Sequence, residues 1–384
     1  MRTQVGIVGA GPAGLLLAHL LHREGIESVV LENRSREYVE QRIRAGVLEQ
    51  GSVDTLVGSG VGERLQREGL VHHGIWLRFE DENHRLPLTE LSGGRSITVY
   101  GQQEVVRDLI RARLDAGLPL LFECKAVEVD PEAASIRYRH AGEDLRLECD
   151  VVAGCDGFHG VCREAIATVT NAFTRDYPFA WLGVLAEVSP ASDELIYAWN
   201  ERGFALHSMR TPELSRLYLQ CRPDEDLGEW AEDRIWQELQ LRLGLPDSFR
   251  GPILESGVTP MRSFVVEPMQ SERLYLAGDA AHIVPPTGAK GMNLAIADVV
   301  VLARALTRHF HDGDDTELAA YSATCLRRVW RAEHFSWWMT SMLHTPDGAD
   351  AFDRRLQLSQ LRYVTSSHAA AASLAENYVG LEKV

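Results

Sequence analysis

Several features that mark secreted, metal-binding or nucleic-acid-binding proteins are missing from this sequence. The 384 residues include six cysteines, no two of which form a Cys-x-x-Cys pair, and the histidines do not cluster near them. Disulfide and zinc frameworks are therefore disfavoured, no metal site is expected, and the cytoplasm is the expected compartment. The formal net charge of −16 disfavours nucleic acid and anionic membrane surfaces as partners, so an anionic substrate would need a local basic cluster.

Long apolar runs are also missing. No stretch of about 18 apolar residues could form a membrane-spanning helix. The apolar start at Val5–Leu21 lacks the charged leader and the cleavage site of a signal peptide. The chain has neither internal repeats nor low-complexity segments. Its hydrophobic and charged contents, 45% and 24%, are those of an ordinary soluble globular protein, and its length allows two or three domains.

What the sequence does contain is a nucleotide-binding fingerprint near its start. An apolar strand runs into Gly9, Gly11 and Gly14 at GxGxxG spacing, and Glu32 follows at the end of a second apolar strand. The first glycine allows the tight turn, the second lets a pyrophosphate approach the backbone, and the third lets the helix pack closely on the strand. Glu32 can accept hydrogen bonds from both ribose hydroxyls. In this context the motif predicts a dinucleotide site rather than an ordinary glycine-rich turn.

Two further strands end in acidic turns and help to distinguish between dinucleotides. Val151–Gly157 reads VVAGCDG, and Leu274–Asp279 reads LYLAGD. A carboxylate at such a strand end can hold another polyol hydroxyl, and Asp279 is the candidate. Because FAD has a ribityl chain as well as a ribose, three motifs around one nucleotide favour FAD over NAD.

The remaining pattern predicts an α/β protein, α+β overall, with a Rossmann-like FAD-binding domain, an inserted antiparallel-sheet substrate domain and a C-terminal helical region. We expect these at residues 1–175 (completed by about 266–300), 176–265 and 300–384. Short alternating segments between Asp176 and Gln220 indicate the inserted sheet. The other expected elements are a βαβ unit at 1–33, a helix at 101–117, two strands around the turn AGED within 133–155, and helices after Asn293 and at Thr316–Leu343.

Six longer strings extend these motifs. They are RIRAGVLEQG (Arg42–Gly51), GCDGFHG (Gly154–Gly160), RSFVVEPMQ (Arg262–Gln270), LYLAGDAAHIVPPTGAKGMNLA (Leu274–Ala295), HFSWWMTS (His334–Ser341) and AENYVGL (Ala375–Leu381). With them, essentially the whole chain resembles the flavin-dependent aromatic hydroxylases that hold one FAD per subunit. The resemblance implies a homodimeric enzyme that uses FAD, NAD(P)H and O₂.

The resemblance also implies which residues hold FAD. The predicted contacts are Gly9, Gly11, Gly14, Glu32, Arg44, Gln102 and Asp279, together with Lys290, Gly291, Met292 and Asn293 at the opening of a helix. The N-terminus of that helix would face the flavin ring, where its dipole and free N–H groups would stabilise the anionic reduced form.

For the substrate, the resemblance implies an aromatic acid. The matching active-site positions are Tyr197, Ser208, Arg210, Arg216, Tyr218, Pro286 and Tyr378. The chemistry of these residues agrees independently. Ser208 and Arg210 lie two apart on a predicted strand and would share a face. A guanidinium with two hydroxyls, from Ser208 and Tyr218, suits a carboxylate.

The implied reaction is hydroxylation of 4-hydroxybenzoate at C3 to 3,4-dihydroxybenzoate by a flavin C4a-hydroperoxide. A phenolate is more nucleophilic at its ortho carbon than a phenol, whose pKa is about 10. Tyr197, Tyr378 and His72 match a relay that removes this proton, and Pro286 completes the implied catalytic set. Two alternatives stay open. One is the same chemistry on another aromatic acid, such as 4-aminobenzoate or a dihydroxybenzoate, and the other is a non-catalytic flavin-binding relative.

The nicotinamide nucleotide must bind without a Rossmann domain of its own, because the chain has one dinucleotide fingerprint. The resemblance implies a surface groove with His159 and Arg262, and specificity set within residues 33–42 by Arg34, Tyr38 and Arg42. Best-known members have Arg where this chain has Asn33. Arg34, Arg36 and Tyr38 favour a 2′-phosphate, whereas Glu37 and Glu40 oppose it. NADPH is the expected donor, with NADH left open.

Overall fold

The computed structural model describes residues 1–42, 46–346 and 348–380. Among these residues, six strands form a mostly parallel sheet in the order β18-β19-β12-β1-β2-β8. They are β1 (Val5–Val8), β2 (Ser28–Leu31), β8 (Leu120–Leu121), β12 (Val151–Gly154), β18 (Gln270–Ser271) and β19 (Leu274–Leu276). Because β1, β12 and β19 run parallel side by side, the glycine turn, the Gly154–Gly157 turn and Asp279 follow strand ends at one edge of the sheet.

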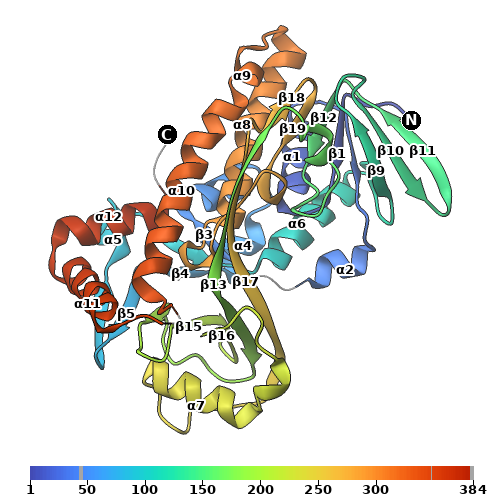
Figure 1. The fold of residues 1–384 in the computed structure, drawn as a ribbon. Coiled ribbons are helices and arrows are strands. Elements are labelled where there is room, and N and C mark those ends of the chain that lie inside the picture. Colours follow the sequence, from blue (N-terminus) through green and yellow to red (C-terminus); the bar gives the residue numbers. More distant parts are fainter. Residues whose placement is uncertain (43–45, 347, 381–384) are drawn as a thin grey trace.

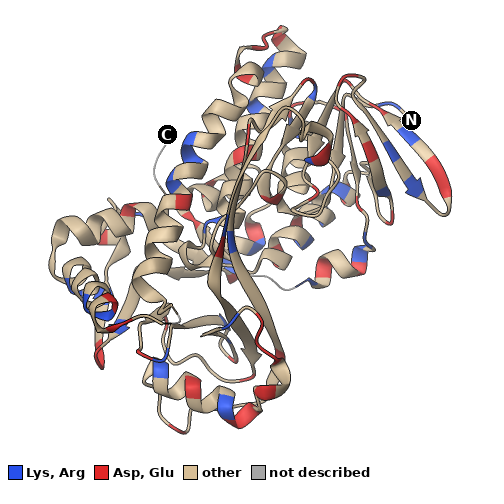
Figure 2. Cartoon of the chain, viewed as in Figure 1, with Lys and Arg blue, Asp and Glu red and all other residues tan. Residues whose placement is uncertain are grey.

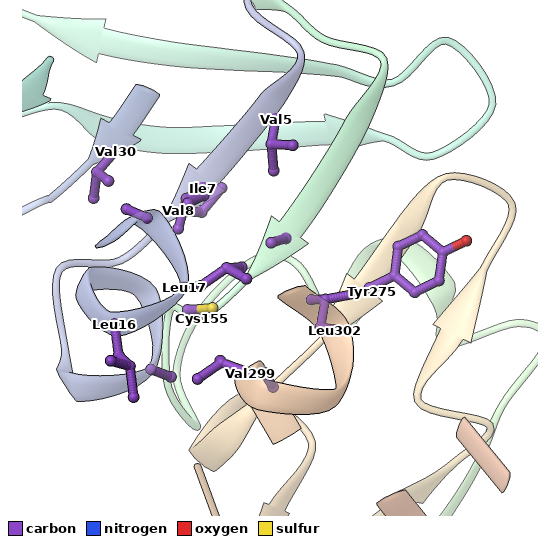
Figure 3. Close-up of a cluster of buried hydrophobic side chains, with 14 of the residues drawn as sticks. Val5, Ile7, Val8, Leu16, Leu17, Val30, Cys155, Tyr275, Val299 and Leu302 are labelled. Carbon is purple, nitrogen blue, oxygen red and sulfur yellow. The ribbon is translucent and has the colours of Figure 1, made fainter. Parts of the chain in front are cut away.

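Helices cover one face of this sheet, and on the other face Ile136 and Leu147 lie next to Gly6 of β1. The helices are α1 (Pro12–Arg23), α6 (Gln102–Asp115) and α8 (Gly291–Asp312), and α1 packs against both others. All four residues of β1 are buried, as expected for a parallel strand covered on two sides. Figure 3 shows Leu16 and Leu17 of α1 close to Val299 and Leu302 of α8, within one apolar core. The βαβ unit and the helix expected at 101–117 are confirmed.

The segment 133–155 differs from its prediction. It forms a hairpin of β10 (Ser135–His140) and β11 (Glu143–Glu148) next to β9 (Lys125–Asp130), and then a third strand, β12, in another sheet. The change of sheet occurs at Cys149 and Asp150, whose backbone N–H groups donate to Ala134 and Gln4. The apolar run LRLECDVVAGC is therefore two strands, because the chain leaves the hairpin to pair with β1.

Within the described residues, the second large sheet has eight strands in the order β20-β17-β13-β16-β15-β14-β5-β6. They are β5 (Ile75–Phe79), β6 (Glu82–Leu86), β13 (Asn171–Ala186), β14 (Ile196–Ala198), β15 (Ala205–Thr211), β16 (Leu214–Cys221), β17 (Ile253–Glu267) and β20 (His282–Ile283). The sheet is mainly antiparallel, with one parallel pair, β14 and β5. β13 and β17 are long paired strands that both continue past residues 175 and 265, the expected domain limits, with a register shift between Asp176 and Ala180 (Figure 1).

The two faces of this sheet pack against different helices. One face is apolar and packs on α7 (Glu232–Leu243), a helix that the sequence pattern did not predict. The other face carries Trp181, Tyr197, Leu206 and Tyr218 and packs on the C-terminal helices. Figure 1 shows the sheet lying between α7 and the group of α10 to α12. We place the candidate substrate site between this face and the C-terminal helices, and we call it the chamber.

The C-terminal region is helical, as expected. Its helices are α9 (Thr316–Ala319), α10 (Tyr321–Leu343), α11 (Ala351–Ser366) and α12 (His368–Val379). The single helix expected at Thr316–Leu343 is wrong in one respect, because it is interrupted at Ala320. Of the aromatic cluster in α10, Phe335 is buried and Trp337 is exposed.

Smaller elements connect these parts. A short sheet contains β3 (Val47–Glu49), β7 (Ile97–Val99) and β4 (Leu70–His72), and the short helices are α2 (Arg36–Gln41), α3 (Gln50–Gly58), α4 (Glu63–Glu68) and α5 (Leu88–Leu91). Across the described chain, no helix combines the length and the apolar character needed to span a membrane.

Candidate active site

The turn between β1 and α1 is built for a ligand that approaches the backbone. Gly9 has φ +104°, and a Cβ there would lie 2.3 Å from the Cys155 carbonyl oxygen. A Cβ at Gly14 would lie 2.0 Å from the Gly9 carbonyl oxygen. A Cβ at Gly11 would meet no protein atom within 4 Å, so this glycine faces open space. No side chain caps α1, which leaves its first N–H groups for a phosphate.

Glu32 stands at the end of β2, as predicted. Its two carboxylate oxygens accept from the backbone N–H groups of Ala10 and Arg34, each at 2.8 Å. Each oxygen keeps a lone pair for a ribose hydroxyl. Asp279 follows β19 and is half-buried, while Gln102 begins α6. Arg44 lies outside the described residues.

The helix opening at Lys290–Asn293 offers its backbone more than its side chains. The Lys290 ammonium donates to Glu49 Oε1 at 2.5 Å and to the Tyr378 carbonyl at 3.0 Å. The Asn293 amide bonds the backbone of Val47, Glu49 and Ala289. Both side chains are thus held within the protein. Among the described residues no side chain caps the start of α8, so its N–H groups remain available to a ligand.

The Gly291 position strengthens this fit, since a Cβ there would also meet open space. Met292 is partly buried against the core. Two uncapped helix starts and two strand-end carboxylates form one donor and acceptor set. That set fits the phosphates, polyols and ring of FAD.

A pair of buried tyrosines forms one end of the chamber. Tyr197 lies on β14 and Tyr378 on α12, and their hydroxyls are 2.5 Å apart. Both side chains are almost fully buried, and burial raises the pKa of both phenols. Both are therefore neutral at physiological pH, and each can donate to or accept from the other or a bound phenol.

His72 lies on β4 and is buried. Its Nε2 is 3.3 Å from Met209 Sδ, and its Nδ1 has no hydrogen-bond partner in the part of the chain that the structure describes. Burial lowers the pKa of His72 to about 4. Within the described residues no hydrogen bond links His72 to either tyrosine, so its place in the relay stays a prediction.

A cationic group forms the other end of the chamber. Ser208 and Arg210 lie on β15, and in the pairing with β16 Ser208 is opposite Arg216 and Leu206 is opposite Tyr218. Opposite residues share a face of the sheet. The register shifts at Arg210, so strict alternation does not place this residue. Burial is the main cause that lowers the pKa of Arg210. Tyr218 raises this pKa and Arg216 lowers it, so both side chains lie near Arg210.

Arg210 has no anionic partner within the described part of the chain. Its Nε is shielded and makes no hydrogen bond, and no carboxylate acts on its pKa. Arg216 is 3.8 Å from Glu255, but its Nη1 also lacks a hydrogen bond. A shielded guanidinium without a counter-ion is costly unless a ligand supplies the charge. This end of the chamber therefore suits a carboxylate.

An aromatic wall that sequence reasoning missed stands beside these residues. Trp181 packs on Tyr218 at 4.8 Å between ring centroids and donates its indole N–H to His344 Nε2 at 2.7 Å. His344 Nδ1 must then carry the proton, which it donates to the Thr340 carbonyl at 3.1 Å. Burial lowers the pKa of His344 to about 3, so this neutral tautomer is retained.

Pro286 is exposed and begins the short turn Pro286–Gly288. This turn is held from α10, where Thr340 donates to the Thr287 hydroxyl at 2.8 Å. A Cβ at Gly288 would lie 2.6 Å from Ser336 Oγ, so helix and turn are in close contact.

The predicted nicotinamide contacts form two aromatic–cation clusters. Arg34 and Arg42 lie 5.2 and 5.8 Å from the Tyr38 ring centroid. Arg262 lies 5.0 Å from the ring of Phe158, which also contacts His159. Arg36 is paired with Glu40 at 2.7 Å. Phe158 was not singled out from the sequence, although it stands inside the string GCDGFHG.

Comparison with known proteins agrees with this geometry. A family model described as FAD binding domain matches residues 2–336. The chain is 47% identical to p-hydroxybenzoate hydroxylase from Acinetobacter baylyi, over 99% of this chain and 96% of that protein. The chain belongs to the FAD-dependent aromatic hydroxylases. FAD is therefore its cofactor and NAD(P)H its electron donor, as the sequence predicted.

More distant relatives share the fold of this hydroxylase. The 3-amino-4-hydroxybenzoate 2-monooxygenase of Streptomyces cremeus is 26% identical over 91% of this chain and 90% of its own. A p-nitrophenol 4-monooxygenase from Pseudomonas putida superposes with a TM-score of 0.86 at 17% identity, covering 99% of both chains. At that identity the structural likeness confirms the fold class alone.

Proposed function

We propose that this aromatic hydroxylase converts 4-hydroxybenzoate and O₂ to 3,4-dihydroxybenzoate and water, with NAD(P)H and a proton as the source of reducing equivalents. The observation that carries the proposal is the chamber with two unlike ends. One end is the guanidinium of Arg210, which has no carboxylate partner among the described residues, and the other is the Tyr197–Tyr378 hydroxyl pair. A para-hydroxybenzoate has a carboxylate and a phenol at opposite ends of one ring. The relative from Acinetobacter carries the same activity in its name.

The bound FAD would supply the electrons and the oxygen transfer, and the protein residues prepare the substrate. Arg210, with the Ser208 and Tyr218 hydroxyls, holds the carboxylate through charge-assisted hydrogen bonds. This fixes the position of the ring and presents its C3 carbon. Trp181 and Tyr218 limit the space beside it and exclude water.

Tyr197 has the second task of sharing the substrate's phenolic proton. A buried neutral hydroxyl can accept that proton's hydrogen bond while it donates to Tyr378, 2.5 Å away. Electron density at C3 rises as the phenol loses its proton. His72 is proposed as the last group of this path, reached after a rearrangement of its contact with Met209.

Three finer statements belong to the same proposal. NADPH is the preferred donor, bound through Arg34, since Arg36 is engaged by Glu40.

The enzyme is a homodimer, with the exposed Phe352, Leu356 and Tyr363 on α11 as its candidate interface. Its compartment is the cytoplasm, where its six buried free cysteines would stay reduced. Light scattering after gel filtration measures the oligomeric state directly.

The deciding experiment is NAD(P)H consumption with a panel of benzoates, with each product identified by mass. Fast, 4-hydroxybenzoate-stimulated oxidation that yields 3,4-dihydroxybenzoate supports the proposal. Equal or faster turnover of 4-aminobenzoate or a dihydroxybenzoate would assign another aromatic acid. A yellow protein that no benzoate stimulates would be a flavin-binding relative without catalysis.

A further inference from the structure

A cavity of about 430 Å³ adjoins the aromatic wall. Its lining comes from α7, from the end of β16, from the turn between β14 and β15, and from the segment that leads into α11. In Figure 1 these elements meet beside α7, away from the nucleotide sheet. The two sites adjoin through Phe179, which lines the cavity and stacks on His344 at 4.7 Å.

Charge of one sign prevails in this cavity. Five arginines and three glutamates line it, in a chain whose net charge is −16. Figure 2 shows basic and acidic residues alternating along α7. The glutamates are largely engaged, since Glu238 pairs with Arg202 and Arg242, and Glu225 lies 3.8 Å from Arg234.

Arg354 is the exception among these arginines. It follows the start of α11 and lines the cavity, yet no carboxylate pairs with it within the described residues. Its Nε is shielded from solvent and makes no hydrogen bond. A half-buried guanidinium without a partner favours an anion nearby.

Two further polar groups in the lining lack partners. Within residues 1–42, 46–346 and 348–380, the indole N–H of Trp230 and the hydroxyl of Thr345 make no hydrogen bond, and these side chains are 7% and 9% exposed. Buried polar groups are nearly always satisfied, so groups left unpaired around one cavity indicate a missing partner. Both can donate a hydrogen bond, and both therefore suit an acceptor oxygen.

We propose that this cavity is a second ligand site, which binds a small organic carboxylate separately from the substrate chamber. Arg354 provides the charge for the carboxylate, and Trp230 and Thr345 donate to its oxygens or to a neighbouring acceptor. Phe179 and Trp230 provide flat apolar surface, which favours an aromatic acid over an inorganic anion. This site does not depend on the assignment of 4-hydroxybenzoate to the first chamber.

Benzoate binding to the FAD-loaded enzyme, measured by equilibrium dialysis, tests the proposal. Arg210→Ala disables the first site, so residual binding reports the cavity. We expect two equivalents per subunit in the wild type and one in Arg210→Ala. Adding Arg354→Gln should weaken the remaining site roughly ten- to a hundredfold, as the loss of a charge-assisted hydrogen bond does. Thr345→Val, close in shape, should weaken it less.

The matched control is Arg355→Gln in the Arg210→Ala background. Arg355 is the next residue of α11 and is exposed, so its loss changes net charge equally but leaves the cavity intact. Flavin content and circular dichroism establish folding of each variant. The proposal is overturned if Arg210→Ala binds no benzoate, or if Arg354→Gln and Arg355→Gln lose affinity alike. Displacement of benzoate by an equal concentration of inorganic phosphate would overturn the choice of an organic carboxylate.

Discussion

The hydroxyls of Tyr197 and Tyr378 are 2.5 Å apart, although the residues are 181 positions apart and lie on a strand and a helix. Neither phenol can ionise readily, because burial raises both pKa values. The pair can move a proton only by exchanging hydrogen bonds with a third group. A substrate phenol at Tyr197 would be that group.

Tyr197→Phe should uncouple the enzyme while leaving substrate binding nearly intact. The carboxylate contacts remain, but the ring stays largely neutral and its C3 carbon is a weaker nucleophile. The activated oxygen is then released as H₂O₂ instead of being transferred to the substrate. The coupling is measured as product formed per NAD(P)H consumed, with H₂O₂ detected by adding catalase. The control is Tyr363→Phe, because Tyr363 is exposed on α11. Full rate and full coupling in Tyr197→Phe would remove phenol activation from its role.

Arg210→Ala should weaken 4-hydroxybenzoate binding by more than a hundredfold, since breaking a buried charge pair costs about 3–5 kcal/mol. Arg210→Lys should also bind poorly, because an ammonium cannot form the planar fork. Flavin difference spectra give the dissociation constants. The uncharged 4-hydroxybenzamide is the ligand control, because it should lose little affinity in the same variant. Equal losses for acid and amide would place the carboxylate elsewhere.

Glu32→Ala should release FAD on dilution. Charge-assisted hydrogen bonds contribute roughly 1.5–3 kcal/mol each, and Glu32 also holds the backbone of the glycine turn at Ala10. Flavin retained through dilute gel filtration is the measurement. The exposed Glu37→Ala, on neighbouring α2, should keep its flavin. A Glu32→Ala protein as yellow as the control would contradict the ribose assignment.

Arg34→Ala should reduce the preference for NADPH over NADH, whereas Arg36→Ala should change it little. Arg34 stacks near Tyr38 without an ion pair in the described structure, while Arg36 is held by Glu40. Initial rates at varied NADPH and NADH give kcat/KM for each donor. The assignment fails if the two variants shift the preference equally.

Glu333 should make the stability of the enzyme fall as pH rises. Burial raises its pKa to about 7, against the lowering effects of its Ser263 hydrogen bond and of His282. The folded state then holds a proton that the unfolded state has lost, so stability declines from about pH 4.5 to about pH 7 and is flat above. The full difference is on the order of 3 kcal/mol. Melting temperatures of wild type and Glu333→Gln should diverge across this window, and parallel curves would contradict the shifted carboxyl.

Local spacing made the nucleotide end predictable. The interval from Gly9 to Glu32 lies within one βαβ unit, so strand, turn, helix and carboxylate could be placed from the sequence. The same reasoning joined β11 to β12 wrongly, because the apolar pattern continues through Cys149 while the backbone changes partners there. Strand β5 was missed in the second sheet because its pairing with β14 joins segments far apart in the chain.

The aromatic wall was outside the reach of sequence reasoning. Trp181 and His344 are 163 residues apart, and neither stands in a motif that marks a pair. The exact hydrogen-bonding state of His344 follows only from its two neighbours in space. Likewise, the lack of a carboxylate partner for Arg210 within the described residues is a property of the folded chain, because the sequence does not show which carboxylates lie near it.

Because β13 and β17 both continue past the expected domain limits, they restrict where the chain can be cut when the substrate chamber is transferred into another flavoprotein. Arg175 is paired with Ser263 and Asp176 with Arg262, so splices at residues 175 and 265 would cut the ladder close to Arg262, a predicted nicotinamide contact. The exchangeable unit must instead contain both strands entire, from Asn171 to Glu267. A transferred segment with both strands entire keeps its own strand pairing. A shorter segment would have to form this pairing between strands from two different proteins.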